Sequence, residues 1–408
     1  MTGVPAVGGA PQIGTRPGTW ARPLRVLHLG FEDPRMPGSG GGSLRTLEIN
    51  RRLAADGLAI TVLTTRFPGC ADRVEEGVRY EHVGIGRGSN RLTRLLGYIA
   101  VLPAAVRARR DADLVVEDFL PPFSSMAVPL WTRRPVIGMV QWLHAREKAR
   151  QYKLPFHLVE RAAVRTHRSL IAVSQGTADR LSVMNPAAAV AVIGNGIDPQ
   201  LLQQPARLGR DVLCIGRLEL AGKGLDLLLP AWARASREVD GDLIIAGGGN
   251  DETRVRRLVE KLGVASRVRF TGWVSGAEKS RLLAGSRLVV LPSRAETFGL
   301  VAVEALAAAT PVIAFDIPCV REVVTATRGR LVPPFDVEAL TAAIVDLYPR
   351  GRHLLELGSA GRAFASAYDW DVLAGQQAAL YRSAVADAAR PAASPPSSPR
   401  RSGKENRP

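Results

Sequence analysis

Short runs rich in Val, Ile and Leu alternate with longer helical patterns along most of the chain, and this alternation occurs in two separate series. The first series predicts strands at residues 24–29, 60–64, 114–116, 136–140, 170–173 and 191–193, and the second at residues 212–215, 243–246, 268–270, 288–291 and 312–315. Helical patterns between successive strands are typical of βαβ units, which build parallel sheets. We therefore expect an α/β protein of two Rossmann-like domains, whose ligands bind beyond the carboxyl ends of the strands in a deep cleft between the sheets.

The chain length fits this division, since 408 residues suit two domains of ~150 to 200 residues each. A segment rich in Pro and Gln, residues 199–205, separates the two series and predicts the hinge. The expected parts are an N-terminal domain at residues 22–200, a second domain at 201–370 and a C-terminal helix at 371–389 that packs back on the first domain. Residues 1–21 and 390–408 have little to bury and are expected to be disordered.

Composition excludes several classes of protein. The three cysteines share no spacing typical of a disulfide framework or a metal site, and no stretch of ~18 apolar residues occurs. We therefore expect a cytoplasmic protein without a metal or other cofactor. The net charge of +16 favours anionic ligands, whether phosphorylated molecules, anionic lipid or nucleic acid. Nucleic acid is the least favoured, because the arginines lie along amphipathic helical patterns without interleaved aromatic residues.

A glycine-rich loop follows the first predicted strand. Gly38, Gly40, Gly41 and Gly42 stand directly before a helix predicted at residues 43–56, where backbone N–H groups can approach an anion. The loop matches neither the dinucleotide-binding GxGxxG pattern nor the phosphate-binding P-loop. Taken alone, it fits an anion-binding loop and a flexible surface loop equally well.

A second candidate follows the first strand of the second series. That strand ends in Gly216 and Arg217, and Lys223 comes six residues later, before a helix that is predicted to start near Leu225. Two cations at a strand end and a helix start suit a diphosphate. Ordinary surface charges are the alternative, and the surrounding glycines favour the diphosphate.

Two acidic residues form the third candidate. Glu296 lies in the loop after a predicted strand, and Glu304 lies in the helix that follows, which we expect to start near Thr297 or Phe298. The free N–H groups of residues 298–300 would then meet a phosphate or a sugar oxygen, and the carboxylates would accept hydrogen bonds from sugar hydroxyls. The alternative roles are helix-start stabilisation for Glu296 and a solvated position for Glu304.

Together these motifs resemble the retaining glycosyltransferases of family four, which have the GT-B fold. The resemblance covers roughly residues 24–385 and includes, in order, the glycine-rich loop, AVSQGTADRL, IGNGID, GRLELAGKG, LIIAGGG, RFTGWVS and the segment with Glu296 and Glu304. It implies that a sugar is moved from a nucleotide-diphosphate sugar to an unidentified acceptor with retention of anomeric configuration. The acceptor would attack on the face that the diphosphate leaves, with a phosphate oxygen taking its proton.

The resemblance also assigns site residues. Arg217 and Lys223 would neutralise the donor diphosphate beside Gly216, Glu304 would hold the ribose hydroxyls, and Glu296 would contact the donor sugar. The backbone of Phe298, Gly299 and Leu300 would cap phosphate and sugar, and the loop of Gly40, Gly41 and Gly42 would close over them. We count Arg217, Lys223, Glu296 and His144 as catalytic and the others as donor-binding.

The sequence departs from the family pattern in three places. The family has a histidine after the strand that corresponds to residues 135–140; strict spacing puts Gln141 there, whereas His144, followed by Arg146 and Glu147, resembles a variant of the motif and is preferred. Ala309 replaces a usual glycine, and residues 317–319, Ile-Pro-Cys, replace a usual glycine pair. The loop near the sugar is therefore expected to differ in shape.

Asp111 and Asp113 spell a DxD motif, which binds a metal in another class of glycosyltransferase. They precede a strand of the first domain, far along the chain from the donor motifs, so we interpret them as a boundary between helix and strand. Two other functions stay open: a nucleotide-sugar epimerase on the same scaffold, and a non-enzymatic basic binding protein.

Residues 91–110 combine apolar residues with terminal arginine clusters. One hypothesis is that this segment rests on an anionic membrane surface, at the inner face of the membrane, and brings the enzyme to a lipid-linked acceptor. The alternative is that its apolar middle belongs to the core, that Pro103 interrupts the helix, and that the acceptor is a soluble small molecule.

Overall fold

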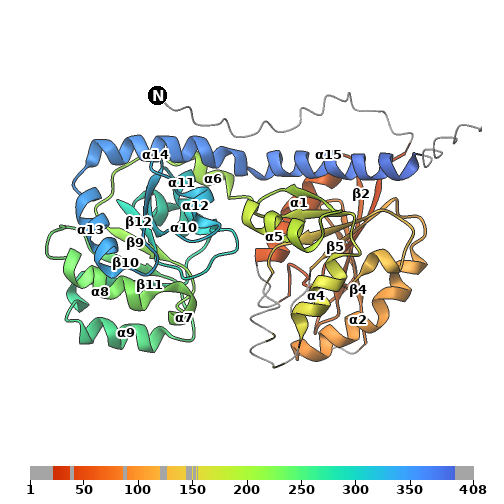
Figure 1. The fold of residues 1–408 in the computed structure, drawn as a ribbon, viewed down its shortest axis with the longest axis horizontal. Helices are drawn as coiled ribbons and strands as arrows, with labels where there is room; N and C mark the ends of the chain where they lie inside the picture. The colour runs from red at the N-terminus through yellow and green to blue at the C-terminus, as the bar shows by residue number, and fades with distance from the viewer. Residues whose placement is uncertain are drawn as a thin grey trace, which may run out of the picture.

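The computed structural model describes residues 22–36, 41–85, 90–119, 126–143, 149, 153 and 155–390. The segments expected to be disordered, residues 1–21 and 390–408, lie outside this range apart from Arg390. The described chain forms two α/β domains side by side, joined along one side by helices α14 and α15 (Figure 1).

The N-terminal domain is built on an eight-stranded sheet in the order β3-β4-β2-β1-β5-β6-β7-β8, parallel except that β3 runs antiparallel to β4. Its strands are β1 (Arg25–Leu29), β2 (Ala59–Thr65), β3 (Arg73–Glu75), β4 (Val78–Val83), β5 (Leu114–Asp118), β6 (Val136–Val140), β7 (Ser169–Ala172) and β8 (Ala189–Val192). Its helices are α1 (Gly41–Ala55), α2 (Arg91–Ala108), the 3-10 helix η1 (Val128–Leu130), α4 (Phe156–Val164) and α5 (Gln175–Met184).

The C-terminal domain is built on a six-stranded parallel sheet in the order β11-β10-β9-β12-β13-β14. Its strands are β9 (Val212–Ile215), β10 (Leu243–Ala246), β11 (Val268–Gly272), β12 (Leu288–Leu291), β13 (Val312–Phe315) and β14 (Gly329–Val332). Its helices are α7 (Leu220–Lys223), α8 (Leu225–Ala235), α9 (Glu252–Lys261), η2 (Ala265–Arg267), α10 (Gly276–Ala284), α11 (Leu300–Ala307), α12 (Val320–Val323), α13 (Val337–Leu347), α14 (Gly351–Ala365) and η3 (Ser366–Tyr368). Strands β9, β10, β12 and β13 are buried along their whole length, because helices cover both faces of the sheet.

The predicted strands are all present, and three further strands were missed. In β4, buried Val78 and Tyr80 alternate with the charged residues Arg79 and Glu81, as expected near the edge of a sheet. The short antiparallel strand β3 covers its outer side. At the opposite end of the second sheet, β14 begins with Gly329 and Arg330, so it lacks the apolar run that marks the central strands.

Four local expectations were wrong. The segment at residues 199–205 is not a plain linker, because Asp198 caps the short helix α6 (Pro199–Gln203) and Leu201 is buried. Helix α1 starts at Gly41, two residues early, and α11 starts at Leu300, after Gly299 in a left-handed conformation. Helix α2 continues through Pro103, because its buried apolar face supplies packing that offsets the hydrogen bond lost at proline.

The chain crosses between the domains twice. The first crossing is at α6, and the second follows α14, where η3 leads into α15 (Trp370–Ala389). Figure 1 shows α14 over the C-terminal domain and α15 over the N-terminal domain. The two crossings lie against each other, since Ile197 forms a β-bridge with Asp369 and a Cβ atom on Gly196 would be 2.2 Å from the Trp370 ring.

Helix α15 packs along α1 of the N-terminal domain. Arg52 of α1 forms an ion pair with Asp371, and fully buried Arg45 donates a hydrogen bond to Gln377 Oε1 at 3.0 Å. Helix α15, the last helix among the described residues, is therefore part of the first domain in space. No helix in the described part of the chain is long and apolar enough to cross a membrane.

Candidate active site

The order of strands in the C-terminal sheet brings two loops together. Strand β9 lies between β10 and β12, so successive connections leave it in opposite directions, and ligands bind parallel sheets at such a point. A small pocket opens there, lined by Gly216, Arg217 and Lys223 after β9 and by Pro292 and Ser293 after β12. The loop after β12 also carries Glu296.

Lys223 and Glu296 contact each other in this pocket. The Lys223 ammonium lies 2.6 Å from Glu296 Oε1, and the Ser293 hydroxyl donates to the same oxygen at 2.7 Å. Both charged side chains are largely buried. The sequence assigned these residues to different parts of the donor; the structure pairs them, so Glu296 orients the ammonium group.

The position of Lys223 depends on the backbone conformation of Gly224, the residue that follows it. Gly224 ends α7 and precedes α8 with φ 66°, a left-handed conformation. A Cβ atom there would lie 1.9 Å from the Pro292 carbonyl oxygen, so only glycine lets the two loops approach this closely. Arg217, by contrast, has a side chain that is 71% exposed, with a weak contact of 3.9 Å to Glu219. Its guanidinium is therefore open to a ligand.

The start of α11 provides backbone donors beside Glu296. Gly299 adopts φ 78° and precedes Leu300, the first helical residue, so the amides at this end point away from the helix without intrahelical acceptors. The Phe298 side chain is buried and packs edge-on against Tyr368, with ring centroids 5.6 Å apart. It also touches Gly194 of the N-terminal domain, where an added Cβ atom would lie 3.0 Å from the ring. The backbone amide of Phe298 is thus available to a ligand, whereas its side chain packs in the interface between the domains.

Glu304 is buried, with 7% of its surface exposed, and is not a solvated helix residue. Its Oε1 accepts a hydrogen bond from the Lys279 ammonium of α10 at 2.6 Å, while its Oε2 is buried without a hydrogen-bond partner among the described residues. Burial raises the pKa of the Glu304 carboxyl, and Lys279 opposes that rise. A buried, unpaired carboxylate oxygen is costly, so this atom is suited to accept a hydrogen bond from a ligand hydroxyl.

Lys279 and Ser293 were missed by the sequence analysis. Lys279 lies 25 residues before Glu304, on another helix, and Ser293 has no charge to draw attention. Neither belongs to a local pattern, so only the fold reveals them.

The facing side of the N-terminal domain contains Gly42 and Gln141. Gly42 lies in the first turn of α1, and a Cβ atom there would be 3.1 Å from Gln141 Nε2, directly after β6. Gly41 begins the same helix. Gly40, His144, Arg146 and Glu147 lie outside the described residues, so Gln141 is the placed candidate for the family histidine position.

A polar network at the same sheet edge was also missed. Strands β1 and β5 are neighbours at the point where the N-terminal sheet changes direction. There Asp118 accepts hydrogen bonds from the Thr46 hydroxyl at 3.0 Å and pairs with His28 at 3.0 Å. The Asp118 side chain is only 14% exposed, so this carboxylate is largely buried at the carboxyl end of β5.

Asp111 and Asp113 lie directly before β5, at the opposite end of that strand from Asp118. Asp113 pairs with Arg22 at 2.6 Å and Asp111 with Arg25 at 2.9 Å. Both aspartates therefore fix the start of the sheet, as their position in the sequence indicated.

The positions that depart from the family pattern adopt unusual backbone conformations. Ala309 has φ 60° and Cys319 has φ 70°, both in the region that favours glycine. The Cys319 side chain is buried, with Sγ 3.4 Å from the Ser174 hydroxyl of the N-terminal domain.

Two family models match the chain in succession. Residues 39–201 match the model described as "Glycosyltransferase Family 4", and residues 209–349 match that described as "Glycosyl transferases group 1". The matches correspond to the two domains and leave only a short gap between them.

Three curated proteins are similar to the chain. It is 29% identical to glycogen synthase from Mycobacterium tuberculosis over 88% of this chain and 95% of that protein. It is 33% identical to MMP alpha-(1->4)-mannosyltransferase from Mycolicibacterium hassiacum, over 48% of each chain. It is 35% identical to phosphatidyl-myo-inositol mannosyltransferase from Mycobacterium leprae, over 45% of this chain and 49% of that one. The chain thus spans about half the length of these two mannosyltransferases.

Two solved structures share the fold. Sucrose-phosphate synthase from Thermosynechococcus elongatus superposes with a TM-score of 0.75 at 23% identity, over 89% of this chain and all of that one. Alr3699/HepE from Anabaena, in complex with UDP and glucose, superposes with a TM-score of 0.68 at 21% identity, over 88% and 100% of the two chains.

Proposed function

The chain belongs to the retaining glycosyltransferases of family 4, with the GT-B fold and a nucleotide-sugar donor, and from this premise we propose how it uses that donor and which acceptor it serves. The C-terminal domain binds the nucleotide-diphosphate sugar through Arg217, Lys223 and Glu304. The acceptor is an amphiphilic molecule that approaches along the N-terminal domain. The relatives described above are transferases or synthases, which favours transfer over epimerisation or non-enzymatic binding.

One observation carries the donor assignment: cations, helix amides and a buried carboxylate converge at the switch point of the second sheet. Lys223 and exposed Arg217 provide two positive charges, and the α11 N-terminus adds the partial positive end of its dipole. Opposite charges ~4 Å apart are worth about 4 kcal/mol at an effective dielectric of 20, enough to favour a diphosphate over a neutral ligand. Glu304 Oε2 lacks a partner that a ribose hydroxyl would supply.

The same groups account for the chemistry. As the bond between the anomeric carbon and the diphosphate oxygen breaks, negative charge grows on the leaving oxygen, where Arg217, Lys223 and the helix amides are already oriented. The acceptor oxygen then bonds to the anomeric carbon from the same face, and its proton passes to the leaving phosphate. This route needs no metal, because the protein's own cations stabilise the diphosphate.

Calorimetry with free UDP, GDP and ADP tests the donor site. We expect at least one of the three to bind wild type. Glu304→Gln should weaken that binding, because a carboxamide accepts hydroxyl hydrogen bonds less well than a carboxylate. Glu296→Gln should slow turnover more than it weakens nucleotide binding, because the Lys223 charge remains at the diphosphate but loses the carboxylate that orients it. Equal affinity in wild type and Glu304→Gln would contradict the ribose role.

Turnover identifies the donor and the reaction. Hydrolysis should be measured with UDP-, GDP- and ADP-sugars, followed by mass spectrometry of products formed in a cell extract and by NMR of the new anomeric centre. A product of inverted configuration, or an epimerised nucleotide sugar without transfer, would overturn the proposal.

The proposed acceptor class rests on an apolar groove in the N-terminal domain, between α2, η1 and α4. It is lined by Leu96, Ile99, Met126, Ala127, Leu130, Val159, Ala162, Ala163 and Thr166. Leu96 is 53% exposed and Leu130 is 73% exposed. Exposed apolar patches of this kind mark binding surfaces in many proteins. The groove thus suits the hydrocarbon part of an amphiphile.

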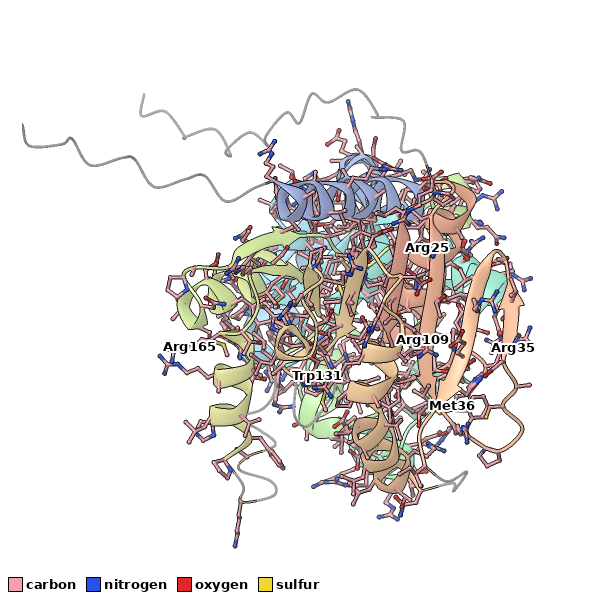
Figure 2. All side chains as sticks on the ribbon, turned by 90° about the vertical axis from the view of Figure 1, so that its right-hand side faces the viewer. Arg25, Arg35, Met36, Arg109, Trp131 and Arg165 are labelled. Atoms are coloured by element: carbon pink, nitrogen blue, oxygen red, sulfur yellow. The ribbon has the colours of Figure 1, made fainter. Side chains whose placement is uncertain are left out.

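Arginines flank the groove and favour an anionic headgroup or membrane surface. Arg107, Arg110, Arg133 and Arg134 cluster around Trp131 beyond one end, and Arg165 lies on the α4 side (Figure 2 labels Trp131 and Arg165). None of the described residues that line the groove or this cluster is acidic. Arg109 is engaged elsewhere, because it pairs with Glu81.

Co-sedimentation with vesicles tests this acceptor class. We expect wild type to bind phosphatidylglycerol vesicles at low salt, to bind them less at moderate salt, and not to bind phosphatidylcholine vesicles. Changing Arg107, Arg110 and Arg133 to Gln should remove the preference, and Leu96→Ser with Leu130→Ser should weaken binding at all salt concentrations. Arg256→Gln, an exposed arginine of the other domain, is the control. No preference for anionic vesicles in wild type would favour a soluble acceptor.

A further inference from the structure

A carboxylate of the C-terminal domain caps a helix of the N-terminal domain. Glu322 of α12 accepts a hydrogen bond from the Gln175 N–H through Oε2 and from the Gly176 N–H through Oε1, each at 2.8 Å. These amides begin α5 and have no acceptor within that helix. The carboxylate therefore satisfies two otherwise unpaired donors and meets the positive end of the helix dipole.

A second contact beside it reaches the donor loop. Ser174, which caps α5 from within, donates from its hydroxyl to the Thr297 carbonyl at 3.3 Å and contacts Cys319 Sγ at 3.4 Å. Thr297 directly follows Glu296 and lies two residues before Gly299, the N-cap of α11. The start of α5 thus touches the loop after β12, which carries Glu296, and the loop after β13, which carries Cys319.

These contacts define the relative position of the two domains at the cleft. A cavity between the domains is lined by Ser174, Gly194, Phe298, Glu322, Tyr368 and other residues, so the interface here is not fully packed. Directional hydrogen bonds, rather than close packing alone, must set the register of the domains at this place. Glu322 supplies two of them, both to backbone groups that cannot move independently of α5.

We propose that Glu322 is a positioning residue, whose carboxylate clamps the start of α5 and so holds the donor loop at residues 296–299 in register with the acceptor domain. This role rests on the proposed function, because it concerns the meeting of donor and acceptor. Arg217, Lys223, Glu304 and the amides at the start of α11, which bind the nucleoside diphosphate in the proposed function, all belong to the C-terminal domain. Loss of the clamp should therefore leave nucleotide binding intact and impair the step that needs both domains.

Two variants perturb the clamp in different ways. Glu322→Ala removes the carboxylate. Gly176→Ala keeps it but places a Cβ atom 3.2 Å from Glu322 Oε1, so the carboxylate must shift by a few tenths of an ångström, while alanine is intrinsically the better helix former. Glu338→Gln is the control, because Glu338 is an exposed carboxylate of the same domain that pairs with Arg234.

The first measurement is steady-state turnover together with calorimetry of the nucleoside diphosphate that wild type binds. Because the clamp consists of two hydrogen bonds to a charged acceptor, we expect kcat to fall about tenfold or more in Glu322→Ala, with Kd for the nucleotide within about twofold of wild type. Gly176→Ala should show a smaller loss, and the double variant should be no worse than Glu322→Ala, since both changes act on one contact. Parallel losses of kcat and nucleotide affinity would mean a merely structural role and overturn the proposal, as would wild-type kcat in Glu322→Ala.

The second measurement does not depend on activity. Hydrogen exchange of the Gln175 and Gly176 amides should be slow in wild type and in Glu338→Gln, and faster in Glu322→Ala. Unchanged exchange would contradict the clamp even if the donor and acceptor were wrongly assigned. Conversely, a wild type that binds none of the three nucleotides but shows the exchange difference would refute the proposed function and leave the clamp standing as a contact between the domains.

Discussion

The paired Lys223 and Glu296 make the two donor cations unequal. Arg217 is open to solvent, whereas Lys223 is already neutralised in part by Glu296. Removing Lys223 therefore deletes one charge from the diphosphate site and also leaves the buried Glu296 carboxylate without its cation. Substitution of Lys223 should therefore affect activity differently from substitution of Arg217, although both cations are assigned to the diphosphate.

We predict that Arg217→Ala and Lys223→Ala each lower kcat/KM at least about tenfold, and that Lys223→Ala is the more severe. Replacing Lys223 with Ala and Glu296 with Gln together should be less than additive, because the two side chains form one unit. Lys261→Ala, an exposed lysine at the end of α9, is the control and should match wild type. Unchanged kcat/KM in both single variants would refute the diphosphate site.

The sequence allowed prediction of residues that follow a strand and belong to a local pattern. Arg217, Lys223, Glu296 and Glu304 met that condition, and the structure places them along one edge of the second sheet. Pairs of residues that meet only through the fold did not satisfy this condition. Lys279 contacts Glu304 from a different helix, and Glu322 contacts Gln175 across the two domains. Such pairs depend on tertiary distance, which residue type and spacing do not encode.

At the scale of elements, the central strands were predictable, whereas three strands at or next to a sheet edge, β3, β4 and β14, were missed. Strands buried on both faces are continuous apolar runs, such as Val212–Ile215, and their bounds agree with prediction. Strand β4 mixes apolar with charged residues, so its pattern is weak. The start of α11 was placed too early because Gly299, in a left-handed conformation, delays the helix.

Two glycines with the same backbone conformation allow a test of the β9–β12 contact. Gly224 and Gly263 have φ 66° and 68°, but only Gly224 has a neighbour, the Pro292 carbonyl, at 1.9 Å from an added Cβ atom. We predict that Gly263→Ala costs about 1 kcal/mol from backbone strain alone, whereas Gly224→Ala costs at least about 3 kcal/mol and also impairs nucleotide binding by displacing Lys223. Urea unfolding measures both. Equal costs would mean that the close approach of the two loops is relaxed in solution.

A charged network fixes the edge of the N-terminal sheet to the loop after β1. Buried Asp33 accepts hydrogen bonds from Arg73 at 2.7 and 3.0 Å and pairs with His82 Nε2 at 2.9 Å, while Asp72 contacts His82 Nδ1 at 3.1 Å. Burial alone would lower the pKa of His82, but its hydrogen bonds to Asp33 and Asp72 outweigh burial and raise it. The pKa of the Asp33 carboxyl is lowered, because hydrogen bonds from His82 and Arg73 outweigh its burial.

These shifts predict how stability depends on pH. Because the folded state raises the pKa of His82, its contribution is complete below its ordinary value near 6.5 and is lost as pH rises through the folded value. The lowered pKa of Asp33 acts oppositely, so its contribution is complete above about 4 and is lost in acid. We predict that the thermal midpoint of wild type falls between pH 6 and 9 more than that of His82→Gln. His353→Gln, a histidine on the exposed side of α14, should keep the wild-type slope; a wild-type slope in His82→Gln would contradict the prediction.

At the scale of the whole molecule, the buried side chain of Arg45 connects α1 to α15, which lies more than 300 residues later in the sequence. The Arg45 guanidinium is fully buried; burial lowers its pKa to about 10, and it donates to Gln377 and, at 3.3 Å, to the Ile193 carbonyl. We predict that Gln377→Ala destabilises the protein by about 2 to 3 kcal/mol, because it removes a hydrogen bond from a buried charge. The neighbouring Gln376 is exposed, so Gln376→Ala should change stability by less than about 0.5 kcal/mol. Calorimetric unfolding separates the two outcomes, and equal values would show that the contact carries no stability.

The return of α15 to the first domain has a consequence for how the protein is made. A ribosome adds roughly 5 to 20 residues per second and releases the N-terminal part first, which usually lets the first domain fold before the second is synthesised. Here α15, in which Trp370, Leu373 and Tyr381 are buried, packs along α1, whose residues were added more than 300 positions earlier. The first domain therefore emerges with one face of its core uncovered and waits for the whole second domain to be translated. During that interval its exposed surface is open to chaperones, and the synthesis of α15, rather than of the first half of the chain, marks the moment at which the N-terminal domain acquires its native core.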